Sequence, residues 1–206
     1  MRIKALCLLG LVFVLCSCAR APIASGAVHY SYASRGVGGG TAAITLSDPE
    51  DDGPFAGLLE DELGRLGSFD RVVRLPAGSG QQAALDAGAV WLFTADVVKR
   101  TETRRAARVF GRHGWAQPTL EVYLECRELP GGQVAWSAQG AYDGNDRVVA
   151  AAYAAFVESR EVPEEPGIAV SLGARTDDYS LGRIPIDGQR FARFCIAAML
   201  EDLPGQ

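Results

Sequence analysis

The cysteine thiols near the N-terminus are the side chains whose setting points most directly to a chemical modification. Cys18 follows a small residue and closes the stretch Leu15–Cys18. Upstream lie a basic start, with Arg2 and Lys4, and an uncharged segment over residues 5–15. A basic start, a short apolar region and a small-residue cleavage site are the layout of an export signal. About 11 apolar residues are too few to span a bilayer, which needs roughly 20. The segment is therefore predicted to be a cleaved signal.

The stretch Leu15–Cys18 resembles the bacterial lipobox, in which a leucine lies three residues before the modified cysteine. This resemblance implies cleavage before Cys18, followed by diacylglyceryl and palmitate-like acyl groups on that residue. Several acyl chains anchor a protein stably, because each buried CH₂ contributes ~0.8 kcal/mol. Ala19 in place of aspartate implies, for enteric-type bacteria, a position on the periplasmic face of the outer membrane. The alternative is an ordinary secretory signal, cut near Ala19 or Ala21 and carrying no lipid.

The remaining cysteines have two interpretations. Cys7 and Cys16 leave with the signal, so Cys126 and Cys195 are the thiols of the mature domain. The periplasm permits disulfides, so these two are able to form a bridge, or they serve as small buried hydrophobic residues. Because the sequence has no CxxC motif and no cluster of cysteine with histidine, we expect no metal site.

A basic cluster is unusual in this acidic chain, whose formal net charge is −5. Six basic residues lie within 14 positions: Lys99, Arg100, Arg104, Arg105, Arg108 and Arg112. One interpretation is a contact for anionic material, such as phospholipid head groups, lipid A phosphates or an acidic partner. The simpler interpretation is a solvated segment at a sheet edge or in a loop.

The other polar residues do not form a recognisable catalytic motif. The two histidines, His29 and His113, lie far apart in the sequence. The best candidates for a hydrolase are adjacent carboxylates in a Pro- and Gly-rich segment, and such carboxylates are usually solvated. The serines lack the Gly-x-Ser-x-Gly turn of serine hydrolases. The residues considered are Glu164, Glu165, Asp177, Asp178, Ser47, Ser171 and Ser180.

Length and composition favour one exported domain. The chain has 206 residues, 48% of them apolar and 22% charged, which is ordinary for a soluble fold. After the signal over residues 1–17, residues 18–40 are small and polar and predict a flexible tether. Alternatively, Tyr30 and Tyr32 belong to a short strand along the domain. Residues 41–206 are predicted to form a single domain.

Hydrophobic spacing predicts a sheet with helices packed on it. Apolar residues recur at helical spacing from Phe55 to Leu66, and Gly67 supplies a stop. The continuous apolar run over 89–98 favours a central strand covered on both faces. Alternation over 119–129 and 133–142, around a Gly-rich turn, predicts a hairpin. Further strands are expected over 41–46 and 69–75, helices over 54–66, 81–87, 146–159 and near 191–203, and an irregular insertion over 160–186. The predicted fold is therefore α/β (α+β), with a mixed sheet of about five strands.

Several of these segments together resemble a family of small envelope proteins. They are Leu58-Leu59-x3-Leu63-x2-Leu66-Gly67, Phe69-x2-Val72-Val73, Ala95-Asp96 and Gly132-x-Val-Ala-Trp136. The family includes the periplasmic part of the curli-secretion lipoprotein, the outer-membrane activators of penicillin-binding proteins and the amino-terminal domain of the Tol propeller protein. The resemblance covers about residues 41–145 and the last helix. It implies a mixed-sheet α/β domain that acts by binding.

These observations lead to one expectation and one alternative. We expect a lipid-anchored, non-enzymatic binding or assembly module of the cell envelope, serving cell-wall synthesis, secretion or appendage assembly. Its expected partners are the membrane, through the lipid on Cys18, and an envelope protein. No cofactor and no nucleic acid is expected. The alternative is a periplasmic envelope hydrolase.

Overall fold

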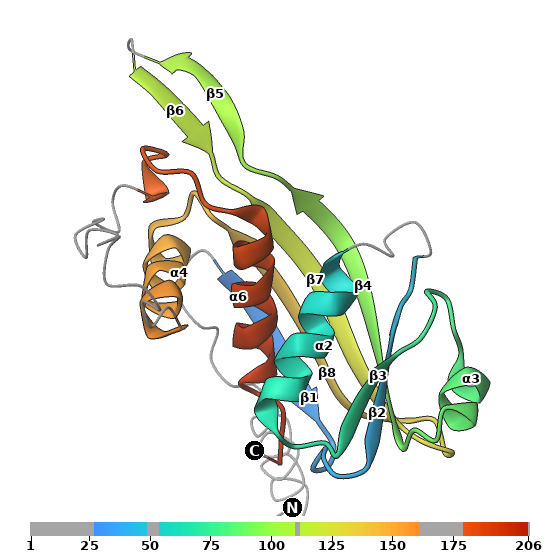
Figure 1. The fold of residues 1–206 in the computed structure, drawn as a ribbon. Coiled ribbons are helices and arrows are strands. Elements are labelled where there is room, and N and C mark those ends of the chain that lie inside the picture. The colour runs from blue at the N-terminus through green and yellow to red at the C-terminus, as the bar shows by residue number, and fades with distance from the viewer. Residues whose placement is uncertain (1–26, 49–53, 110–111, 161–178, 206) are drawn as a thin grey trace, which may run out of the picture.

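The computed structural model of the chain describes residues 27–48, 54–109, 112–160 and 179–205. Six strands form one mixed sheet in the order β1-β8-β7-β4-β2-β3 (Figure 1). The strand β2 is parallel to β3 and β4, and the remaining pairs are antiparallel. The bounds are Ala27–Ala33 for β1, Thr41–Leu46 for β2, Arg71–Arg74 for β3, Trp91–Thr101 for β4, Thr119–Glu128 for β7 and Gln133–Asp143 for β8. The predicted α/β class with a mixed sheet is confirmed, with six strands in place of about five.

Three helices cover one face of the sheet, and a short helix covers part of the other (Figure 1). The covering helices are α2 (Pro54–Leu66), α4 (Arg147–Arg160) and α6 (Gly188–Leu200), and the short one is α3 (Gln81–Asp86). Side-chain caps fix where two of them begin. Asp146 accepts hydrogen bonds from the backbone N–H groups of Val148 and Val149 at the start of α4, and Asp187 accepts one from Arg190 at the start of α6. Such caps satisfy amide groups that have no partner within the helix.

The main core lies between the sheet and the three covering helices. Trp136 of β8 is fully buried and packs against Phe93 of β4, whose ring also meets Phe69 edge to face at 5.6 Å. A second group of rings joins α4 and α6 to the sheet through Tyr142, Tyr153, Phe156, Phe191 and Phe194. Aromatic side chains each bury a large apolar area, so these two groups supply much of the packing.

The predicted hairpin and the helix over 54–66 are confirmed. Along β7 the buried residues are Leu120, Val122, Leu124 and Cys126, and they alternate with partly exposed ones. Gly67 ends α2 with a φ of 66°, a conformation that glycine adopts without strain. The predicted covering of β4 on both of its faces is confirmed only at the start of the strand. Leu92 packs under α3, whereas Asp96 on the same face is exposed, because α3 is too short to cover the whole strand.

The predicted tether over 18–40 is wrong for residues 27–33. These residues form β1, which pairs antiparallel with β8 from Ala27 opposite Tyr142 to Ala33 opposite Trp136. The alternative of a short strand carrying Tyr30 and Tyr32 is therefore correct. Residues 18–26 lie outside the described residues, as do 161–178 of the predicted irregular insertion, while residue 160 ends α4.

A buried carboxylate ties the three covering helices together. The side chain of Glu62 on α2 is 3% exposed, and both of its oxygens accept hydrogen bonds from Arg160 Nη1 of α4, at 2.9 and 2.7 Å. Arg65 Nη1 and Arg193 Nε of α6 lie 3.4 and 3.5 Å from the same carboxylate. The neighbouring Asp61 is largely exposed and pairs with Arg193 Nη2 at 2.7 Å. These ion pairs therefore join the three helices whose apolar side chains also pack together in the main core.

Candidate interaction surfaces

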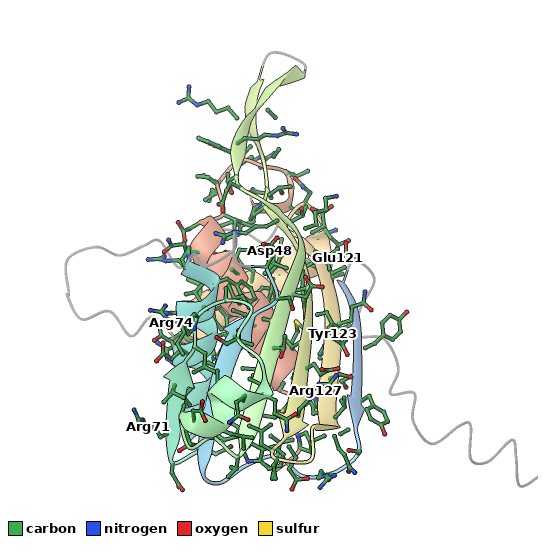
Figure 2. The ribbon with its side chains drawn as sticks, turned by 90° about the vertical axis from the view of Figure 1, so that its right-hand side faces the viewer. Asp48, Arg71, Arg74, Glu121, Tyr123 and Arg127 are labelled. Atoms are coloured by element: carbon green, nitrogen blue, oxygen red, sulfur yellow. The ribbon has the colours of Figure 1, made fainter. Side chains whose placement is uncertain are left out.

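The predicted basic cluster lies on and beside a protruding hairpin. Lys99 and Arg100 are near the end of β4, and the next two strands are β5 (Arg104–Val109) and β6 (Arg112–Ala116). These two strands form a separate two-stranded sheet that extends past the end of the six-stranded one in both views (Figures 1 and 2). We call this element, residues 103–109 and 112–116 as described, the arm. Most of the cluster therefore lies on a distinct structural element, and its contact with anionic material stays a prediction.

Two arginines of the arm present their charge to solvent. Arg104 and Arg105 are both exposed, and they lie opposite Ala116 and Trp115 across the ladder. The guanidinium of Arg105 lies 5.6 Å from the centre of the Trp115 ring, at cation–π distance. Arg100, below the arm, is paired with Glu102 at 2.8 Å. The side chains of Arg108 and Arg112 lie outside the described part of the structure.

The base of the arm is held by a buried amide. Gln117 is 3% exposed, and its Nε2 donates hydrogen bonds to the carbonyl oxygens of Tyr179 and Ile184, both at 2.7 Å. The backbone N–H of Trp115 donates to the carbonyl oxygen of Gly182 at 2.8 Å. Because both N–H donors of this buried amide are satisfied, it holds the segment over residues 179–184 against the base of the arm. The base is therefore fixed to the body of the protein, while the strands beyond it extend outward.

The second surface is the face of the sheet that α3 leaves uncovered (Figure 2). We call it the open face. Figure 2 looks onto it and shows Glu121, Tyr123 and Arg127 following one another along β7. The registers of the ladders place Tyr30, Gln139, Tyr123 and Asp96 in one row across four strands. The sequence analysis did not identify this surface, because its residues come from segments distant in the chain.

The open face combines tyrosines with carboxylates. Tyr30 and Tyr32 on the edge strand β1 are 61% and 52% exposed. On β7, Glu125 accepts a hydrogen bond from Arg127 Nε at 2.6 Å and one from the Tyr123 hydroxyl at 3.3 Å.

Asp96 and Glu121, in contrast, have no ion-pair partner within 4 Å among the described residues. Lys99 lies opposite Glu121 in the ladder. Partial burial raises the pKa of Tyr123, so its hydroxyl stays protonated and remains a hydrogen-bond donor. The open face can therefore accept cationic groups at Asp96 and Glu121 and stack them on its tyrosine rings.

A pocket of about 500 Å³ lies between α4 and the sheet. Its wall is mainly apolar and includes Val148, Ala152 and Phe156 of α4 and Phe194 of α6. His29 also lines it, and burial lowers the pKa of this histidine below its usual 6.5, so the imidazole is neutral at pH 7.

The described polar groups near the pocket do not form a catalytic triad. Ser31 Oγ donates its hydrogen bond to Asp202 Oδ2 at 2.9 Å, and not to an imidazole. His29 Nε2 lies 3.7 Å from the same oxygen, beyond hydrogen-bond distance. A serine nucleophile needs its base within about 3.2 Å, so this arrangement does not activate Ser31. The carboxylates considered for a hydrolase, Glu164, Glu165, Asp177 and Asp178, lie outside the described residues.

The cysteines behave as buried hydrophobic residues. Cys126 and Cys195 are both free and buried, so the structure contains two small buried hydrophobic residues and not the disulfide. Burial raises the pKa of both thiols, which keeps them protonated at neutral pH. Cys18, the residue expected to carry lipid, lies outside the described residues. Within the described residues, none of the helices is long and apolar enough to cross a membrane.

Comparison with known proteins gives a match in structure but not in sequence. No protein-family model matches the chain, and no curated protein matches it. Two solved structures of PelC from Paraburkholderia phytofirmans, both dodecamers and one a variant, align with TM-scores of 0.53 and 0.51. Each is 17% identical in sequence, and each alignment covers 87% of this chain and 99% of that one. The chain therefore shares the fold of the PelC chain.

A further structure, the lipoprotein GNA1162 from Neisseria meningitidis, aligns over 60% of this chain and 97% of that one. Its TM-score of 0.31 and its identity of 10% are too low to carry a conclusion. The predicted resemblance to envelope proteins is thus supported only at the level of a shared, distant fold. Membership in the narrower curli, synthase-activator and Tol group stays a prediction.

Proposed function

We propose that this protein is a lipid-anchored envelope lipoprotein that acts without catalysis and assembles with copies of itself into a closed oligomer. The observation that carries the proposal is the match to PelC, because that chain forms a dodecamer and its fold extends over 87% of this one. The lipobox-like stretch Leu15–Cys18 supplies the anchor. Cell-wall synthesis, secretion and appendage assembly are the processes that such a module would serve.

The described surfaces are consistent with a binding role. The arm extends from the body, and the open face is half uncovered and rich in tyrosine. Tyrosine and arginine are enriched at protein interfaces, because both combine a large contact area with hydrogen bonding. The position expected for the mature protein is the periplasmic face of the outer membrane, where Cys18 and Ala19 would direct it.

Membrane fractionation and mass measurement test the two parts of this proposal separately. The full chain, expressed in a bacterium with an outer membrane, should pellet with that membrane, and Cys18→Ala should appear in the soluble periplasmic fraction. After extraction in mild detergent, the wild-type protein should show a mass many times that of one chain by light scattering. A Cys18→Ala variant that still pellets would contradict the lipid anchor, and an extracted monomer would contradict the oligomer.

A further inference from the structure

The arm has few contacts with the rest of the described chain. A two-stranded ribbon is marginally stable in water unless a third strand or another element packs against it. Among the described residues, the hydrogen bonds between the arm and the body are at its base, through Trp115 and Thr103, next to the buried Gln117. The exposed pair Arg104 and Arg105 lies on the ribbon itself. A surface outside the chain that covers the ribbon would stabilise it.

The charge of the arm is opposite to that of the rest of the chain. Residues 103–116 contain four arginines and His113 but no carboxylate, whereas the remaining sequence has 16 Lys and Arg residues against 25 Asp and Glu residues. A cationic ribbon on an otherwise acidic protein is complementary to other copies of that protein. Such complementarity accelerates encounter and fixes orientation.

The open face has the chemistry that the arm requires. Asp96 and Glu121 offer carboxylates that no described residue pairs with, and guanidinium groups bind carboxylates through two parallel hydrogen bonds. Tyr123 lies directly opposite Asp96, and Tyr30 and Tyr32 offer exposed rings farther along the same face, on which arginine stacks. The arm cannot cover this face in its own chain, because it continues outward beyond the end of the sheet (Figures 1 and 2).

We propose that the arm of one copy docks on the open face of the next copy, with Arg105, on the ribbon face that it shares with Trp115, against Asp96 and Glu121. Arg104 points to the opposite face of the ribbon and adds to its positive charge. This inference rests on the self-assembly proposed above and names the two surfaces that perform it. A closed ring of more than two copies requires two different, complementary surfaces on each copy. The arm and the open face are such a pair, and the described residues leave each of them uncovered.

Charge reversal on each side tests the contact. The arm variant is Arg104→Glu with Arg105→Glu, and the face variant is Asp96→Lys with Glu121→Lys. Like charges then meet in either variant, and we expect the concentration at which the extracted oligomer half-dissociates to rise by on the order of a hundredfold. Mixing the two variants in equal amounts should restore the oligomer, because the reversed arm fits the reversed face and the native arm fits the native face.

A matched control separates the contact from general effects of charge. Arg71 and Arg74 are exposed on β3, at the far edge of the sheet from β1. Reversing both to glutamate makes the same change in net charge as the arm variant, and the oligomer should persist. Circular dichroism checks that every variant is folded, as expected for substitutions at exposed or half-exposed positions.

Each result decides between the proposals. Dissociation of both variants with rescue on mixing supports the contact between arm and open face. A wild-type oligomer that survives both reversals overturns this contact but leaves the proposed function standing. A wild-type monomer overturns both. An arm variant that stays oligomeric but loses retention on vesicles containing phosphatidylglycerol overturns the contact too, and assigns the arm to anionic lipid.

Discussion

Replacing Glu62 by alanine should destabilise the protein through the junction of α2, α4 and α6. The substitution removes two hydrogen bonds from Arg160 and the charge near Arg65 and Arg193. Removing one member of a fully buried ion pair costs about 3–5 kcal/mol. The three arginine side chains are 29–49% exposed and regain water, so the expected loss in the free energy of unfolding is smaller, about 2 kcal/mol. For a domain of this size that corresponds to a fall in Tm of roughly 4–8 °C.

Asp61→Ala is the matched control for this prediction. Asp61 is the adjacent carboxylate and contacts the same Arg193, but its side chain is 56% exposed. An exposed ion pair contributes about 0–1 kcal/mol, so the control should lose little stability. Urea unfolding followed by circular dichroism, on the lipid-free Cys18→Ala chain, measures both changes. The reasoning fails if Asp61→Ala costs as much as Glu62→Ala, or if Glu62→Ala stays within about 0.5 kcal/mol of the parent.

Three further outcomes are expected from other buried polar groups. Burial lowers the pKa of His29 in the folded chain, so the unfolded chain takes up a proton on this imidazole at a higher pH than the folded chain does. The free energy of unfolding should therefore fall as the pH drops below 6.5. The difference between the urea midpoints at pH 7.5 and 5.5 should be smaller for His29→Gln than for the wild-type protein. Tyr142→Phe should be neutral or stabilising by up to about 1 kcal/mol, because the buried hydroxyl makes no hydrogen bond to any described residue; a clear loss in Tm would refute this. Cys126 and Cys195 should react with a maleimide only in denaturant, without prior reduction, and a requirement for reductant would reveal a disulfide.

Sequence patterns predicted those elements that have one apolar face. The helix α2 was found with its bounds because Phe55, Leu59 and Leu63 recur at helical spacing and Gly67 provides the positive φ that ends it. The hairpin of β7 and β8 was found because Leu120 to Cys126 alternate between apolar and polar. In each case the residues that carry the pattern are those that enter the core.

Elements without such a face were missed or, like β1, predicted only as an alternative. In β1 the residues that point inward include His29 and Ser31, while the aromatic Tyr30 and Tyr32 point to the open face, so the pattern resembled a polar tether. The strands of the arm carry arginine and alanine and have little to bury. The open face was missed because its rows depend on which strands pair. Tyr30 and Tyr123 share a row because β1 and β7 both pair with β8. Local periodicity does not show which strands pair.

The position of β1 at the edge of the sheet also sets how closely the protein would be held to a membrane. Eight residues separate Cys18 from Ala27, where β1 begins, and a fully extended chain of that length reaches about 30 Å. A lipid on Cys18 would thus keep the Ala27 end of β1 within about 30 Å of the bilayer and confine every copy to the same thin layer at the membrane. Neighbouring copies would then meet by diffusion in two dimensions at a raised effective concentration, so that weak contacts between individual domains are sufficient to hold an array together.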